Sequence, residues 1–136
     1  MRVFLDTNIF LYATGGSHPQ REPCARVLLR VADKTLEATI NSEVVQEILY
    51  VLTRRGQRGE ALTLARHLTS LFPELLPVTR DDILGACELL RNYPRLPVRD
   101  AVHAATMLRN GLSTIVSVDA DFDQVSQIRR LAPNAV

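Results

Sequence analysis

The chain has 136 residues, 46% of them hydrophobic, so it can bury the core of one compact domain without disulfides or a structural metal. Its formal net charge of +1 excludes a uniformly basic nucleic-acid clamp, so a local patch would have to hold any polyanion. Two distant cysteines, Cys24 and Cys87, argue against a zinc site, redox catalysis and a secreted disulfide framework. We expect one domain over residues 1–136, with buried, reduced thiols, a cytoplasmic location and no membrane span.

The N-terminal part alternates apolar runs with helical patterns. Val3 to Leu5 is a short apolar run that predicts a buried strand, and Asp6-Thr7-Asn8 predicts a turn or helix cap at its carboxyl end. The next elements we predict are a helix over residues 20–33, a strand over 37–40 and a helix to about residue 55 that Asn41-Ser42 caps.

After a break at residues 53–60, the second half predicts more helices and a late strand. The predicted elements are a helix over residues 60–71, a short segment over 75–78, a helix over 79–92 capped by Thr79, an alanine-rich helix over 99–110 stopped by Gly111, a strand over 113–118 and one edge strand near 128–131. Strands that alternate with helices predict an α/β fold, in which a mostly parallel central sheet has helices on both faces.

Ligands of such sheets bind beyond the carboxyl ends of the strands, where both Asp6 and Asp119 fall. Asp119 opens the acidic segment 119–123, in which Asp121 and Asp123 follow at alternating positions. Three neighbouring acids repel one another unless a cation or arginines lie nearby. Asp119 is closest to the strand end and is therefore the strongest candidate, whereas the other two also fit a solvated turn.

Asp100 lies in the first turn of its predicted helix, where the helix dipole already stabilises an acid. It shares a stripe with Ala104, Met107 and Gly111, which predicts that it borders a closely packed face. His103 follows three residues later, and a single histidine on such a helix is more often a packed or solvated side chain than a ligand or base.

Glu47 borders the apolar stripe of the predicted helix that starts after Asn41, whereas Glu43 lies further toward solvent in the first turn. Glu47 has no basic residue four positions away, and its neighbour at that spacing is Glu43 itself. An acid at the core edge without a partner predicts that a cation supplies the missing charge.

Four carboxylates from distant parts of the chain, without cysteine ligands or a histidine pair, suit Mg²⁺ or Mn²⁺. These candidate residues are Asp6, Glu47, Asp100 and Asp119. Such ions activate water and neutralise the charge of a phosphodiester.

At these residues the sequence resembles the PIN-domain family, and within it the VapC-type toxins of toxin–antitoxin pairs. The resemblance covers nearly the whole chain and is carried by VFLDTNIFLY, VVQEILYVL and VRDAVHAATMLRNGLSTIVSVDADFD, in that order. It implies that the four candidate acids bind metal and are catalytic, that Asp121 and Asp123 are accessory ligands, that Asn8 accompanies the first acid, and that Ser117 or Thr7 orients a carboxylate. It further implies an Mg²⁺- or Mn²⁺-dependent endoribonuclease that cuts single-stranded or structured RNA, forms a homodimer and binds a cognate antitoxin.

Arginines near the acids are candidates for RNA binding. Arg95 and Arg99 precede Asp100 closely enough to hold a phosphate, with Asn8 as a further candidate substrate contact. A second group, Arg54, Arg55 and Arg58, is more simply explained as helix-end residues that face solvent.

The residues argue against two other classes of protein and leave two related functions open. A haloacid-dehalogenase-type phosphatase needs a second Asp where this chain has Asn8, and a receiver domain needs a late lysine, whereas the single lysine here is Lys34. A housekeeping RNA-processing nuclease of the same family and a non-catalytic scaffold that binds RNA or protein stay open. The scaffold is disfavoured because it has no reason to keep an unneutralised acid cluster at a core edge.

Overall fold

The computed structural model describes residues 2–136. In chain order the elements are β1 (Arg2–Leu5), α1 (Thr7–Thr14), α2 (Arg21–Ala32), β2 (Glu37–Thr39), α3 (Ser42–Arg54), α4 (Arg58–Leu71), α5 (Arg80–Asn92), α6 (Val98–Arg109), β3 (Thr114–Val116), the 3-10 helix η1 (Ala120–Gln124), β4 (Arg129–Leu131) and the 3-10 helix η2 (Pro133–Ala135). The strands form one sheet in the order β2-β1-β3-β4, and each neighbouring pair is parallel.

The centre of the sheet is apolar on both faces. Val3, Phe4 and Leu5 of β1 and Ile115 and Val116 of β3 have no exposed surface. Parallel strands that helices cover on both sides read as continuous apolar runs, which is why β1 could be recognised from three residues.

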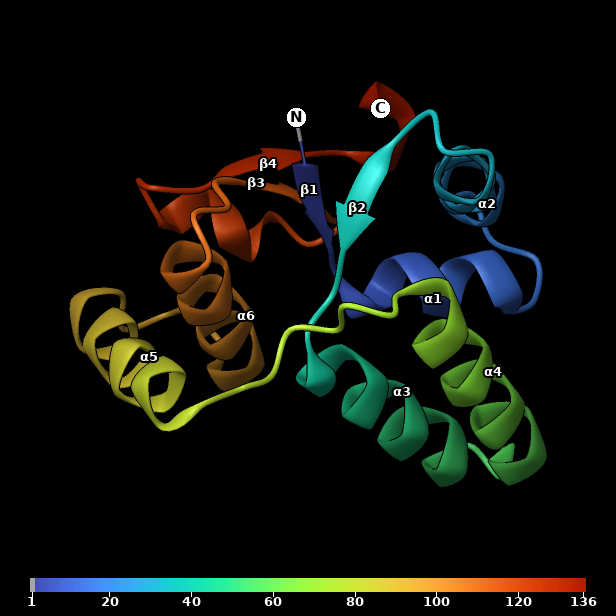
Figure 1. Cartoon of the computed structure of the whole chain (residues 1–136), viewed down its shortest axis with the longest axis horizontal. Coiled ribbons are helices and arrows are strands. Elements are labelled where there is room, and N and C mark those ends of the chain that lie inside the picture. The colour runs from blue at the N-terminus through green and yellow to red at the C-terminus, as the bar shows by residue number, and fades with distance from the viewer. Residues whose placement is uncertain (1) are drawn as a thin grey trace.

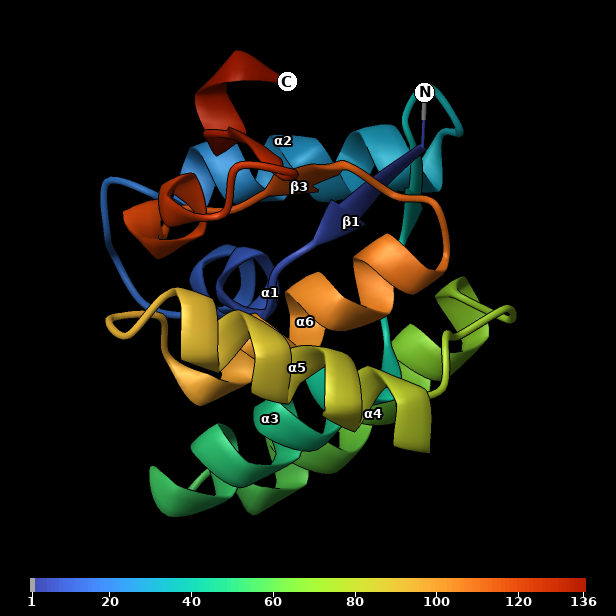
Figure 2. The same cartoon turned by 90° about the vertical axis from the view of Figure 1, so that its left-hand side faces the viewer.

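The helices pack in consecutive pairs, α1 with α2, α3 with α4 and α5 with α6. Figure 1 shows α1 and α2 on one side of the sheet and α5 and α6 on the other, and the rotated view in Figure 2 agrees. The predicted α/β fold with helices on both faces is thus confirmed. The α3–α4 pair extends beyond the carboxyl ends of β1 and β2 (Figure 1), an arrangement that the sequence pattern did not predict.

Three helix ends form as their sequences predict. The Asn41 side chain accepts a hydrogen bond from the backbone N–H of Val44, and Thr79 and Asp82 form a capping box at the start of α5. After α6, Gly111 has φ +71°, and the N–H groups of residues 111 and 112 bond back to the carbonyls of residues 108 and 107. This Schellman closure favours glycine because its backbone is left-handed.

The sequence placed the last central strand at residues 113–118, but β3 covers Thr114–Val116. The N–H of Ser117 still bonds to the carbonyl of Leu131, but the next two backbone donors bond to side chains: the N–H of Val118 to Asn8 and the N–H of Asp119 to Ser117. The predicted edge strand is present as β4.

One prediction on the cysteines was wrong: Cys24 is buried, but Cys87 is exposed, and both are free thiols. Cys87 lies on α5, whose outer face has no further layer above it (Figure 2). No helix among residues 2–136 is long and apolar enough to cross a membrane.

Candidate active site

Acids from four separate segments gather at the carboxyl edge of the sheet. Asp6 directly follows β1 and caps α1, and Asp119 follows β3 and caps η1. Asp100 comes from the first turn of α6 and Glu47 from the middle of α3. The crossover connections of a parallel sheet bring these distant segments to one edge, as predicted.

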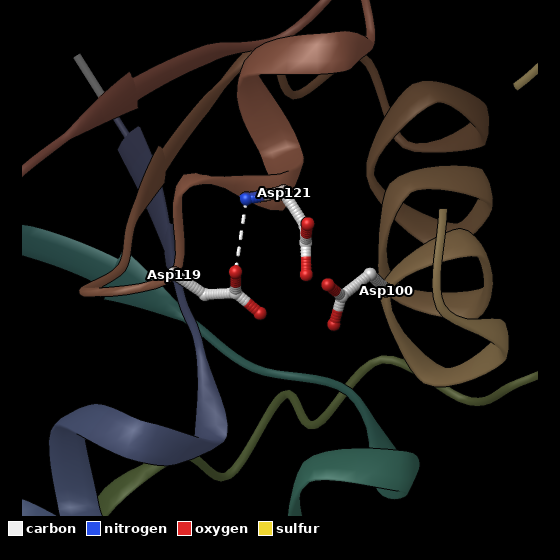
Figure 3. A group of neighbouring side chains, drawn as sticks. All are labelled: Asp100, Asp119 and Asp121. Atoms are coloured by element: carbon white, nitrogen blue, oxygen red, sulfur yellow. Dashed lines mark hydrogen bonds between the residues drawn. The ribbon is translucent and has the colours of Figure 1, made fainter. Parts of the chain in front are cut away.

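Three of the acids form a close group. Asp100, Asp119 and Asp121 each offer one carboxylate oxygen, and these oxygens all lie within 4.8 Å of one another. Figure 3 shows Asp100 reaching from α6 toward the other two carboxylates. The backbone N–H of Asp121 donates to Oδ1 of Asp119 (2.9 Å), which fixes the turn and aims both side chains at Asp100 (Figure 3).

Asp100 is the least compensated member of this group. It is 8% exposed, and its Oδ2 is a buried oxygen without a hydrogen-bond partner among the described residues. Burial, together with the charges of Asp6 and Asp119, raises the pKa of Asp100 to about 8.

The group fits a divalent ion of the Mg²⁺ or Mn²⁺ type. Its donors are carboxylate oxygens from two segments, and the orphaned Oδ2 of Asp100 is a buried acceptor that a cation would satisfy. We therefore place the candidate metal site at Asp100, Asp119 and Asp121, with Asp6 close enough for its charge to affect Asp100.

Asp6 is buried and accepts hydrogen bonds on both oxygens. The backbone N–H of Thr7 donates to Oδ1 (2.8 Å), and the Ser117 hydroxyl donates to Oδ2 (2.6 Å). Burial nevertheless raises the pKa of Asp6, although these hydrogen bonds act in the opposite direction. Ser117 thus orients a carboxylate, as the sequence analysis expected.

Glu47 faces the cluster from α3, but the argument that it lacks a partner is wrong. Its Oε1 accepts from the Thr7 hydroxyl (2.9 Å) and lies 3.4 Å from Nε2 of His103, and its Oε2 accepts from Arg99 (3.2 Å). These partners come from other elements, so spacing along α3 could not reveal them. Burial opposes the shift, yet the hydrogen bonds from His103 and Thr7 and the charge of Arg99 lower the pKa of Glu47.

Asn8 connects α1 to the end of β3. Its amide nitrogen donates to Oγ of Ser117 (3.3 Å), and its Oδ1 accepts from the N–H of Val118 (3.4 Å). Both ends of the side chain are therefore occupied within the protein, which favours a structural role over the expected substrate contact.

Asp123 is the one predicted accessory acid that the structure keeps out of the close group. It forms a two-bond ion pair with Arg130 from β4, at 2.9 and 3.1 Å. Arg130 also donates to the backbone carbonyl of Ser117, which ties the acidic turn to the sheet. An arginine thus pairs directly with Asp123, whereas Asp119 and Asp121 form no ion pair with any of residues 2–136.

Residues 3–128 match the PIN domain, nearly the whole chain including every acid described above. The chain belongs to the PIN-domain family. It is 32% identical over 134 residues to ribonuclease VapC7 of Mycobacterium tuberculosis, covering 98% of this chain and 92% of that protein. It is 36% identical over 120 residues to ribonuclease VapC23 of the same species, covering 86% of this chain and 92% of the relative.

Solved structures agree on the fold. FitAcB from Neisseria gonorrhoeae superposes with a TM-score of 0.75 at 18% identity over 100% of both chains. VapC20 of Mycobacterium tuberculosis, described as a toxin that cleaves the sarcin-ricin loop, superposes with a TM-score of 0.75 at 23% identity, over 91% of this chain and 95% of that one. VapBC2 from Rickettsia felis, bound to a promoter DNA fragment, gives 0.74 at 17% identity, over 97% of this chain and 98% of that one.

The arginines of this PIN domain do not divide as the sequence suggested, because Arg54 of the second group and Arg99 of the first lie against the same tyrosine ring. Arg99 is half-exposed, bonds to Glu47, and places its guanidinium 5.6 Å from the ring centre of Tyr50. Arg54 lies 5.7 Å from the same ring centre and donates to the Tyr50 hydroxyl. Arg95 is exposed in the loop before α6. A cation next to the acids is thus held in place by an aromatic ring.

His103 and Asn41 have contacts that were not predicted from the sequence. His103 is fully buried in this PIN domain, between the Asn41 amide and the carboxylates of Asp6 and Glu47. The spacing of three residues from Asp100 was a weak signal for His103. For Asn41 the sequence predicted a helix cap and nothing more, because its amide nitrogen contacts α6 only in the folded chain.

Proposed function

We propose that this protein is a Mg²⁺- or Mn²⁺-dependent endoribonuclease and the toxin of a VapBC-type toxin–antitoxin pair. The observation that carries the proposal is the close group of Asp100, Asp119 and Asp121 with its unpartnered buried oxygen. The names of the relatives, ribonucleases VapC7 and VapC23, support RNA as the substrate.

The proposed site assigns a role to each acid. Asp100, Asp119 and Asp121 would hold the ion, and Asp6 and Glu47 flank it with carboxylates that their hydrogen bonds keep in place. When bound, a divalent ion of this kind supplies positive charge for the phosphodiester and lowers the pKa of water. Asp100 must lose its proton for the ion to bind, so its raised pKa links metal binding to pH.

RNA would approach on the side where Arg99 lies. Its side chain is half-exposed, and its guanidinium forms a hydrogen bond with Glu47. It could therefore bind a phosphate next to the scissile phosphodiester. Stacking on Tyr50 limits the freedom of the Arg99 side chain, which lowers the entropy cost of holding that phosphate. Arg95 remains a candidate for a second, looser phosphate contact.

The proposed partners follow from the same family. VapBC-5 of Mycobacterium tuberculosis, which has the same fold, is described as a member of the VapBC family of toxin–antitoxin systems, and we expect a cognate antitoxin to bind this chain as well. We also expect a homodimer. Because the proposed substrate is cellular RNA, the cytoplasm is the expected place of action.

Purified full-length protein should cleave single-stranded RNA when Mn²⁺ or Mg²⁺ is present and lose the activity in excess EDTA. Expression alone should arrest growth, and co-expression with the product of the adjacent reading frame should relieve the arrest and yield a stable complex. Undiminished cleavage in EDTA would contradict the metal-dependent mechanism. Harmless expression of a monomer that copurifies with nothing would instead favour an RNA-processing or scaffold role.

A further inference from the structure

A fully buried histidine adjoins the acid cluster without belonging to the group of close carboxylates. His103 lies on the inner face of α6 with no exposed surface, and its ring packs 5.5 Å, centre to centre, from the ring of Phe4. Each of its two nitrogens faces a polar group from another segment: Nδ1 faces Asn41, and Nε2 faces Glu47 and Asp6.

The orientation of the Asn41 amide follows from its role as a helix cap. The backbone N–H of Val44 can only donate, and it points at Oδ1 of Asn41 over 3.0 Å. The oxygen is therefore on the α3 side, and the amide nitrogen faces α6, 3.2 Å from Nδ1 of His103 and 3.2 Å from Oγ1 of Thr106.

This orientation determines which nitrogen of His103 carries the proton. The Thr106 hydroxyl donates to the carbonyl of Val102 (3.0 Å), so it accepts from Asn41. The second amide hydrogen of Asn41 then points at Nδ1 of His103, which must offer a lone pair. A neutral imidazole whose Nδ1 accepts carries its hydrogen on Nε2.

The Nε2–H group points between two carboxylates, with Oε1 of Glu47 at 3.4 Å and Oδ1 of Asp6 at 3.8 Å. These two oxygens also accept from Thr7, through its hydroxyl and its backbone N–H. A neutral donor between the two acids reduces their repulsion and fixes one oxygen of each. The cluster therefore has a supporting contact that comes from the same helix as Asp100.

Burial and geometry exclude two other roles for this ring. His103 has no exposed surface from which to reach RNA, and its Nε2 is protonated toward acids rather than offered to an ion. We infer that His103 is a positioning residue of the active site, held by Asn41 as the Nε2–H tautomer so that its N–H aligns Asp6 and Glu47. This inference rests on the proposed function for its link to catalysis, but the tautomer can be measured without it.

The direct test is a long-range ¹H–¹⁵N correlation spectrum of the metal-free full chain, labelled with ¹⁵N-histidine, near neutral pH. The exposed His18 and His67 are assigned by H18Q and H67Q. We expect the signals of His103 to show the Nε2–H form. An Nδ1–H form or a doubly protonated ring in the wild-type protein would overturn the inference, and this readout needs no variant of the site to fold.

The sharpest variant is N41D. Aspartate caps helices as well as asparagine does, but it places an acceptor where the amide donor was and so favours a proton on Nδ1. We expect the His103 spectrum to change, Mn²⁺ affinity and kcat to fall by about 10- to 100-fold, as for other residues that orient metal ligands, and the KM for RNA to stay within about twofold. A changed tautomer with unchanged affinity and kcat would overturn the positioning role.

Because N41D also adds a charge, it is repeated in an H103L background, where only that charge can act. We expect N41D to have little effect there, and an equal effect in both backgrounds would overturn the role of the tautomer. H103Q, whose amide can still donate to Glu47, should retain more Mn²⁺ affinity than H103L. If the protein cuts no RNA at all while the tautomer and the Mn²⁺ results hold, the proposed function fails and the inference on the acids stands.

Discussion

Glu47 and Asp100 are two carboxylates of one cluster that the protein treats in opposite ways. Glu47 has hydrogen-bond donors from three residues, and its pKa is lowered in spite of burial. Asp100 keeps one buried oxygen without a partner, and burial raises its pKa to about 8. The hydrogen-bond donors around a buried acid therefore decide its charge state. Glu47 is stable as an ionised carboxylate, whereas Asp100 needs a proton or a cation.

The largest effect is expected from D100N. Loss of a ligand to the proposed ion removes several kcal/mol of transition-state stabilisation, so RNA cleavage should fall by more than about 100-fold. Mn²⁺ binding, measured by calorimetry, should fall with it. The matched control is D123N, because Asp123 belongs to the same acidic segment but pairs with Arg130 outside the close group. Equal losses in both variants would contradict the division between them.

The pH dependence of Mn²⁺ binding sharpens the comparison further. Burial raises the pKa of Asp100 to about 8, so below this pH its carboxyl holds a proton that must leave before the ion binds. Affinity should therefore rise about tenfold per pH unit up to about that pH and then level off. Calorimetry in two buffers of different ionisation enthalpy would show close to one released proton near neutral pH. If the Mn²⁺ affinity did not depend on pH and no proton were released, the raised pKa would belong to another group.

The metal-free stabilities of D100N and E47Q should change in opposite directions. Asp100 keeps its proton when the unfolded chain, with a pKa of 3.8, has lost it, so wild-type stability falls as pH rises from about 4 to about 8. D100N should remove this pH dependence. At the upper end of this pH range, its free energy of unfolding should exceed that of the wild type by on the order of a few kcal/mol. Ionised Glu47 instead contributes stability above its unfolded pKa of 4.5, which is lost as pH falls further.

For E47Q we therefore expect a loss of about 1 to 2 kcal/mol near neutral pH, because charge-assisted hydrogen bonds to three partners are weakened. Urea denaturation in EDTA over a pH series measures both variants. If E47Q were the stabilised one, the two acids would have exchanged roles.

The smallest effect is expected from R99A. Loss of one phosphate contact should raise the KM for RNA several-fold and reduce the salt dependence of binding by about one unit of slope, with a smaller change in kcat. R95A tests the looser contact in the same way. R58A, an exposed arginine at the start of α4, is the control and should leave both quantities unchanged.

Local chemistry was enough to predict most of the fold. The apolar run Val3 to Leu5, the caps Asn41 and Thr79 and the stop at Gly111 all act within a few residues, so they are visible in a linear pattern. Asp6 and Asp119 could be placed at one edge because parallel strands end on the same side. The end of β3 was missed, since Asn8 and Ser117 take over backbone donors only after the chain has folded.

The sequence by itself determined the alternation of strands and helices, the acids at the strand ends and the family, because periodicity, capping and motif spacing are properties of neighbouring residues. Only the tertiary structure decided which acids are compensated. Arg99 reaches Glu47 from α6, Arg130 reaches Asp123 from β4, and His103 and Asn41 meet across α3 and α6. Such pairings depend on three-dimensional distance and burial, and these set the electrostatic energy of each carboxylate.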